Sequence, residues 1–102
     1  MKFVAVIYEP MYDHNDKKYI RIVLPDTVVN RVRSKHEIDG RVLTVKVPFR
    51  YRRVMSKNMG TRPLQSLIKG DEIEVDIDFR GAWNVGEYSG YSWVLSSATS
   101  SV

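Results

Sequence analysis

The chain has 102 residues, of which 43% are hydrophobic and none is cysteine, and its formal net charge is +4. A chain of this length builds one hydrophobic core, so we expect a single domain over residues 1–98 and a flexible tail at residues 99–102. The lack of cysteine excludes a disulfide scaffold and a thiolate-ligated metal site, and it favours a reducing, cytoplasmic location. No segment reaches the roughly 18 to 20 apolar residues needed to cross a bilayer, so we expect no membrane association.

The charge is unevenly distributed along the chain. Residues 1–70 carry 7 Lys and 8 Arg against 6 acidic residues, a balance of +9, and residues 71–102 have a balance of −5. Such an asymmetry suggests a basic face that binds a polyanion. The alternative is that the two halves neutralise each other across neighbouring strands.

The N-terminal quarter of the chain predicts a β-hairpin. Residues 2–8 and 18–24 are rich in Val, Ile and Tyr, which favours two strands. The polar cluster at residues 13–16 predicts a longish connection between them.

A short helix is expected after Pro25, which ends the second strand. Asp26 can cap this helix, and three valines lie on one side of it: Val28, Val29 and Val32. Valine is a poor helix former, so the prediction depends on the apolar face rather than on propensity.

The longest predicted strand covers residues 41–54. One of its faces carries the apolar residues Leu43, Val45, Val47, Phe49 and Tyr51. The other face carries Thr44 and three cations, Lys46, Arg50 and Arg52, because side chains alternate along a strand. Pro48 lies within this strand and favours an edge position or a bulge.

The middle of the chain predicts an exposed loop followed by an apolar turn. Residues 56–63 have loop composition, and the residues expected to form one helical turn or apolar plug are Leu64, Leu67 and Ile68.

The C-terminal third predicts two strands joined by a wide loop. Residues 72–79 alternate strictly, with four apolar residues pointing inward and four acidic residues pointing outward. Three glycines make residues 81–90 a glycine-hinged loop, and residues 91–98 form the last strand. Five short strands with a helical element between the third and fourth predict a small closed or partly closed barrel, with an SH3-like barrel as the nearest competitor.

From residue 67 onward the sequence resembles a known family. Residues 67–71 read Leu-Ile-Lys-Gly-Asp, residues 72–79 form the acidic strand, a Trp and glycines follow, and residues 91–98 end in small residues. This pattern resembles the second half of an oligonucleotide-binding (OB) barrel of the single-stranded DNA-binding type, most closely the small phage-type members. The fold class that we expect is therefore all-β, a five-stranded OB-fold-like barrel with one or two short helical elements.

The resemblance implies a groove that binds single strands with aromatic side chains and cations, largely without reading sequence. Carried over by position, Trp83 and Tyr88 lie on the loop between the last two strands, and the third strand supplies Lys46, Arg50 and Arg52. Two features depart from the family. The chain ends in uncharged residues rather than a flexible acidic tail, and the strand before the loop displays four acidic residues.

Further candidates come from the residues themselves. Tyr19 and Tyr51 are expected to stack on bases, and Lys57 and Arg62 are loop cations without acidic neighbours in sequence, as is Lys69. The expected nucleic-acid-binding site is Tyr19, Lys46, Arg50, Tyr51, Arg52, Lys57, Arg62, Trp83 and Tyr88. The opposing interpretation pairs Arg50 and Arg52 with strand acids, in contacts worth about 0.2 to 1 kcal/mol each; these acids are Glu74, Asp76 and Asp78.

The other aromatic and titratable residues are expected in the core, beside the first turn or at the surface. The residues expected in the core are Phe3, Phe49, Phe79 and, as one interpretation, Trp93. Tyr8, Tyr12 and Tyr19 flank the first turn, where groove lining and ordinary packing are equally supported. His14 and His36 are isolated in sequence and are expected at the surface rather than on a metal.

No catalytic motif is present: the sequence contains no GxSxG, P-loop or GxGxxG. The outward acidic residues repeat at about 7 Å along one strand face, too far apart for one metal ion. We therefore expect neither an enzyme nor a cofactor.

The expected function is sequence-tolerant single-stranded DNA binding in replication or recombination, in the host cytoplasm if the chain is phage-encoded. RNA is an alternative ligand, because a small RNA-binding domain like that of a translation factor suits the mild basicity. A second alternative is a protein-interaction or assembly barrel whose charges neutralise each other. A homodimer is compatible with a short chain that has Pro48 on an edge strand.

Overall fold

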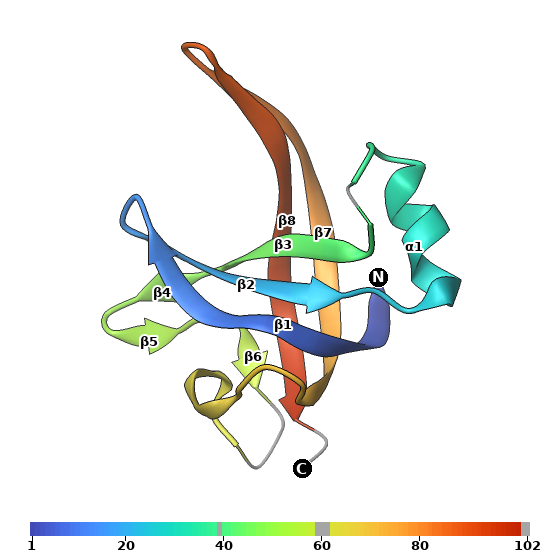
Figure 1. Ribbon diagram of the computed structural model, residues 1–102. Helices are drawn as coiled ribbons and strands as arrows, with labels where there is room; N and C mark the ends of the chain where they lie inside the picture. The colour runs from blue at the N-terminus through green and yellow to red at the C-terminus, as the bar shows by residue number, and fades with distance from the viewer. Residues whose placement is uncertain (39, 59–61, 101–102) are drawn as a thin grey trace.

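The computed structural model describes residues 1–38, 40–58 and 62–100, with the side chains of residues 57 and 58 outside the description. Five long strands close in a ring: β1 (Lys2–His14), β2 (Lys17–Val23), β3 (Val42–Val47), β7 (Glu72–Val85) and β8 (Tyr88–Ser100) (Figure 1). Antiparallel pairing runs β3-β2-β1-β7-β8, and a parallel contact between Lys46 of β3 and Val94 of β8 closes the ring. The predicted all-β fold, a five-stranded barrel with one or two short helical elements, is confirmed, and the helical elements number two in the described residues.

The core lies inside the ring and follows the predicted alternation. Every ring strand contributes fully buried aliphatic side chains, among them Ile7, Ile20, Ile22, Val45, Val75, Ile77 and Leu95. Each such side chain stabilises the fold by about 1.5–3 kcal/mol relative to an exposed one. Phe3 and Trp93 are buried as predicted, whereas Phe49 and Phe79 are only partly buried.

The first hairpin is tighter than predicted. β1 extends to His14 and β2 begins at Lys17, so the connection is a two-residue turn. Asn15 and Asp16 occupy that turn with φ of 50° and 64°, the left-handed conformation that short hairpin turns require and that Asn and Asp tolerate.

Helix α1 (Asp26–Arg33) buries its three valines as predicted, but its cap differs from the prediction. The N-cap is Pro25, and no side chain caps the helix. The Pro25 carbonyl accepts hydrogen bonds from Val28 N at 3.0 Å and Val29 N at 3.1 Å. The Asp26 carboxylate instead forms an ion pair with Arg41, the residue directly before β3.

The predicted long strand 41–54 is wrong, because the chain folds back on itself after Pro48. β3 ends at Val47, and a separate hairpin follows, made of β4 (Phe49–Arg50) and β5 (Arg53–Val54). Tyr51 and Arg52 form its turn with φ of 53° and 63°. Pro48 has no N–H for the β3 ladder, and its carbonyl accepts a hydrogen bond from Met55 N at 2.8 Å, which fixes the start of the hairpin.

The segment after this hairpin is more ordered than the predicted loop. β6 (Lys57–Asn58) pairs in parallel with Ser97 and Ala98 of β8. Ser56 is buried, and its hydroxyl donates a hydrogen bond to the Leu95 carbonyl at 2.6 Å. Residues 59–61 of the predicted loop lie outside the described residues.

The predicted apolar turn is present as the short 3-10 helix η1 (Leu64–Ser66). Leu64 and Leu67 are buried, but Ile68 is exposed, so the apolar plug contains two residues rather than three.

The predicted glycine loop at residues 81–90 is also wrong. β7 and β8 stay paired from Gly81 opposite Ser92 to Val85 opposite Tyr88, and this hairpin rises from the ring as the longest projection in Figure 1. We call residues 81–91 the aromatic arm. Gly81 has φ of 93° where the pairing register shifts, so glycine marks a bulge rather than a loop.

Strand β8 continues beyond the predicted domain boundary. Thr99 and Ser100 pair with Glu74 and Ile73, and residues 101–102 lie outside the described residues. Neither α1 nor η1, the two helices in the described part of the chain, is long and apolar enough to span a membrane.

Candidate nucleic-acid interface

The acidic strand does not neutralise the basic one. β7 lies between β1 and β8, so its acids face the start of the chain rather than β3 or β4. The α-amino nitrogen of Met1 lies 3.1 Å from Oδ1 of Asp76, and Lys2 Nζ lies 3.3 Å from Oε1 of Glu74. In the described part of the chain, no ion pair joins Arg50 or Arg52 to Glu74, Asp76 or Asp78, which removes the alternative of cross-sheet pairing.

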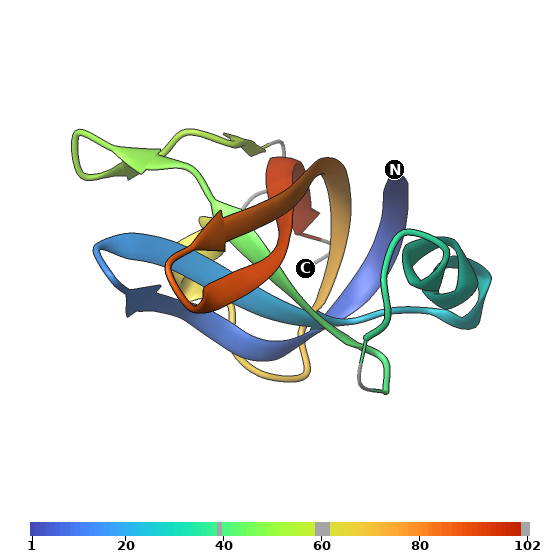
Figure 2. The same cartoon turned by 90° about the horizontal axis from the view of Figure 1, so that it is seen from above.

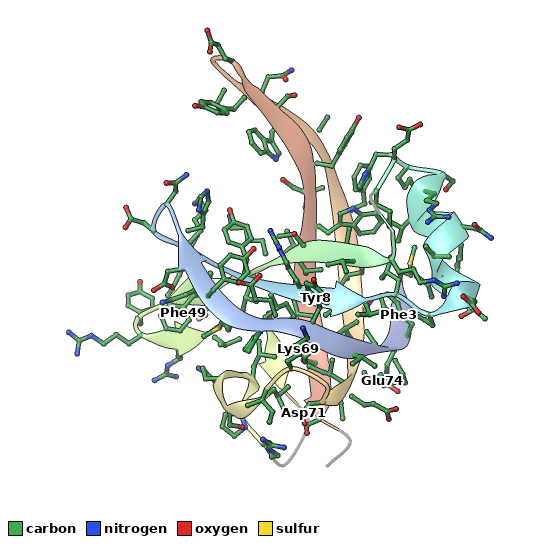
Figure 3. The ribbon with its side chains drawn as sticks, viewed as in Figure 1. Phe3, Tyr8, Phe49, Lys69, Asp71 and Glu74 are labelled. Atoms are coloured by element: carbon green, nitrogen blue, oxygen red, sulfur yellow. The ribbon has the colours of Figure 1, made fainter. Side chains whose placement is uncertain are left out.

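Four cations instead surround an open pocket of about 190 Å³ at the end of β3. They come from β2, β3 and β4, and we call the site the cationic pocket: Lys17, Lys18, Lys46 and Arg50. Asp16, Val47, Pro48, Phe49 and Val94 complete its lining. Figure 3 shows Phe49 well away from Asp71 and Glu74, so the pocket and these acids occupy different parts of the barrel.

The electrostatics of the cationic pocket favour an anion. Burial, and then the neighbouring charges of Lys17 and Arg50, lower the pKa of Lys46. Lys18 forms an ion pair with Asp13, and its Nζ lies 5.0 Å from the centroid of the Phe49 ring. Lys17, Lys46 and Arg50 have no ion pair with any carboxylate that the structure describes. A negative ligand would relieve this crowding of like charges.

The outer face of β2 and β3 adds aromatic surface next to this pocket. Tyr19 lies opposite Lys46 in the β2–β3 pairing. Its ring centroid is 5.9 Å from that of Tyr12, and the Arg21 guanidinium lies 5.9 Å from the Tyr12 ring. Tyr19 is half-buried, so it combines packing against Tyr12 with a partly open position beside the cations.

The aromatic arm displays large side chains to solvent. Trp83 is 42% exposed and Tyr88 is 75% exposed, with Val85 and Tyr91 also exposed. Trp83 lies opposite Gly90, and a Cβ on Gly90 would come within 2.7 Å of Cζ2 of the indole. Because Gly90 has no Cβ, the indole can pack against the backbone of the partner strand.

His36, expected as an isolated surface residue, joins an aromatic cluster at the base of the arm. Its ring stacks on Tyr91 with centroids 4.2 Å apart and planes at 4°. Nε2 of His36 accepts a hydrogen bond from the indole N–H of Trp93 at 2.8 Å, and Nδ1 lies 2.9 Å from the Glu37 carbonyl oxygen. Because an indole N–H can only donate and a carbonyl can only accept, His36 is neutral here, with its proton on Nδ1. No local signal joins His36 to Trp93, which is 57 positions away.

Four of the predicted site residues lie away from both the cationic pocket and the aromatic arm. Tyr51, which is 89% exposed, and Arg52 form the tip of the β4–β5 hairpin. Arg62 lies beside η1, where it is 3.6 Å from Asp71 Oδ2 and donates to the Ser66 carbonyl. The backbone of Lys57 belongs to β6, and its side chain lies outside the description.

Two residues that the sequence did not select, Lys17 and Lys18, belong to the cationic pocket. They begin β2, directly after the polar turn, where a charged side chain is ordinary. Pairing of Lys18 with Val47 brings the start of β2 to the end of β3, and the β3–β8 contact adds Val94 to the lining.

The three hairpin tips share one side of the molecule. Figures 1 and 2 place the ends of β1–β2, β4–β5 and the aromatic arm on the side of the barrel away from α1. Among the described residues no group of three His, Asp or Glu side chains is placed to hold a metal ion.

Comparisons with protein-family models, with curated proteins and with solved structures gave no match for this chain. A function must therefore be argued from the chain's own geometry: unpaired cations around one pocket, half-buried tyrosine beside them, and an exposed aromatic arm on the same side of the barrel.

Proposed function

We propose that the protein binds single-stranded nucleic acid without reading its sequence, with single-stranded DNA as the principal ligand in replication or recombination. The observation that carries this proposal is the set of cations, Lys17, Lys46 and Arg50, gathered around an open pocket with no carboxylate paired to them among the described residues. An ion-paired surface would have no comparable attraction for a polyanion.

In this proposal the cations hold the phosphate backbone. Each phosphate that a cation neutralises releases a counterion, and for single strands the logarithm of the affinity falls by about 0.7 per contact for each unit of log salt. Arg50 also offers a planar fork of N–H donors that matches two phosphate oxygens. Binding should therefore weaken steeply as salt rises.

Aromatic side chains supply the contacts to bases. Trp83 and Tyr88 on the arm, with Tyr19 on β2, present rings on which bases stack, at about 1–3 kcal/mol for each stacked base. Every base has an aromatic face, so stacking tolerates any sequence.

The β4–β5 turn gives independent support. Tyr51 and Arg52 hold a positive φ, which a short turn accommodates far better with Asn or Gly. A bulky pair at these positions costs stability, and such strained positions cluster at binding sites. Their side chains extend the cationic and aromatic surface beyond the pocket.

A fluorescence titration tests the proposal. Trp83 is exposed and Trp93 is only 2% exposed, so quenching by an oligo-dT of about 20 nucleotides reports on the arm. We expect salt-sensitive quenching that the Trp83→Ala variant loses. Equal affinity for duplex DNA, or no quenching at low salt, would contradict the proposal. A matched RNA oligomer shows whether 2′-hydroxyl groups favour RNA instead.

A protein-interaction role is the second candidate, and exposed Val85 favours it. An aliphatic side chain that is 68% exposed near the arm tip contributes little to base stacking but suits an apolar interface. If this role is correct, no oligonucleotide quenches Trp83, and sedimentation shows self-association that Val85→Ser reduces.

A further inference from the structure

The cationic pocket carries more positive charge than an internal phosphate needs. Lys18 is already paired with Asp13, which leaves Lys17, Lys46 and Arg50 against Asp16 in the lining, a balance of +2. An internal phosphodiester carries a single negative charge. A phosphate monoester carries about −1.5 to −2 at neutral pH and offers three acceptor oxygens.

The pocket is also a hollow rather than a flat track. Its walls come from five parts of the chain, namely the β1–β2 turn, β2, β3, β4 and β8, around about 190 Å³. Asn15 and Asp16 hold that turn in a fixed left-handed geometry, and Pro48 fixes the exit from β3. The unpaired cations Lys17, Lys46 and Arg50 come from β2, β3 and β4, so three different strands bring positive charge to one hollow.

Lys46 gives a second reason for a dianion. Its side chain is half-buried at the wall of the pocket, and the positive charges of Lys17 and Arg50 repel its ammonium group. A doubly charged ligand neutralises the balance of +2, whereas a singly charged one leaves +1.

We propose that the cationic pocket binds a phosphate monoester as its dianion, so that the protein prefers a phosphorylated strand end to internal phosphodiesters. The pocket's choice of a strand end rests on the proposed function, but the phosphate site itself does not. The chemistry is non-covalent: the three unpaired cations donate hydrogen bonds to the terminal oxygens, and no bond forms or breaks.

Competition between three otherwise identical oligo-dT strands tests the strand-end preference. The strands carry a 5′-phosphate, a 3′-phosphate or no terminal phosphate. We expect at least one phosphorylated strand to bind about tenfold more tightly than the bare strand, as extra charge-assisted hydrogen bonds allow. Lys46→Gln and Arg50→Gln should bring this ratio close to one. Arg31→Gln, a charge-matched control at an exposed position of α1 on the other side of the barrel, should keep it.

Inorganic phosphate tests the site without nucleic acid. We expect phosphate to raise the melting temperature of the native chain more than chloride does at equal ionic strength, and Lys46→Gln to lose that extra rise. Equal binding of all three strands overturns the strand-end preference and leaves the proposed function standing. A phosphate-dependent rise without binding of any strand overturns the proposed function and supports the site. If phosphate gives no extra rise in melting temperature and all three strands bind equally, the phosphate site itself is overturned.

Discussion

Two hairpins project from the barrel, and they carry different chemistry. The β4–β5 hairpin presents Arg50, Arg52 and Arg53, while the aromatic arm presents Trp83 and Tyr88. Both are held by main-chain pairing and both expose their side chains. Because Arg50 and Trp83 lie on separate elements, single substitutions can test the expected roles of charge and of stacking one at a time.

The largest effect should come from the barrel that supports both hairpins. Ile22→Ala removes a side chain with no solvent exposure and should lower the free energy of unfolding by about 2–5 kcal/mol. Tyr88→Ala on the arm should change it by no more than about 0.5 kcal/mol. Urea denaturation measures both. A large loss in Tyr88→Ala would mean that the arm is part of the core and not a projection.

The two hairpins should differ most clearly in how they affect the binding of oligo-dT. Trp83→Ala should cost about 1–3 kcal/mol of affinity and leave the salt slope unchanged. Arg50→Gln should instead reduce the salt slope by about 0.7. Oligo-dT titrations of both variants at several salt concentrations measure the two quantities. A change of slope in Trp83→Ala equal to that in Arg50→Gln would break the separation.

Gly90 tests how the arm seats its indole. Its φ is not in the left-handed region, so alanine suits the backbone, but the new Cβ would meet the Trp83 ring at 2.7 Å. Gly90→Ala should displace the indole, shift its fluorescence and cost about 1 kcal/mol. In a Trp83→Ala background the same change should cost almost nothing, and a double-mutant cycle measures the difference.

The smallest effect concerns Lys46. Its pKa is lowered in the folded state, so the charged side chain destabilises the fold at neutral pH, and this penalty fades as pH rises through the lowered pKa. Lys46→Gln should therefore raise the melting temperature slightly at pH 7 while it weakens binding. A lower melting temperature without any ligand would show that the lysine stabilises the barrel by packing.

Much of the fold follows from local pattern. Residues 72–79 alternate strictly, and the structure buries Ile73, Val75 and Ile77 while it leaves the acids on the outer face. Residue type and position predict a site that includes Tyr19, Lys46, Arg50, Trp83 and Tyr88. In the structure these residues lie at the pocket, beside it or on the arm. Their role in binding stays a prediction.

Two errors have the same physical cause. Residues 81–90 have a loop's share of glycine, yet continuous pairing between β7 and β8 makes them strand. Residues 49–54 have a strand's composition, yet Pro48 and a left-handed turn fold them into a hairpin. Composition measures local preference, and pairing partners decide whether it prevails.

The sequence by itself determined an all-β chain with one core, a basic first part and an acidic last part, because periodicity and charge are local properties. Only the tertiary structure decided which charges stay unpaired. Pairing of β1 with β7 brings Met1 and Lys2 to the acids of β7, and pairing of β2 with β3 brings the start of β2 to the end of β3. Such contacts join residues far apart in sequence, and they depend on strand order, which no local pattern encodes.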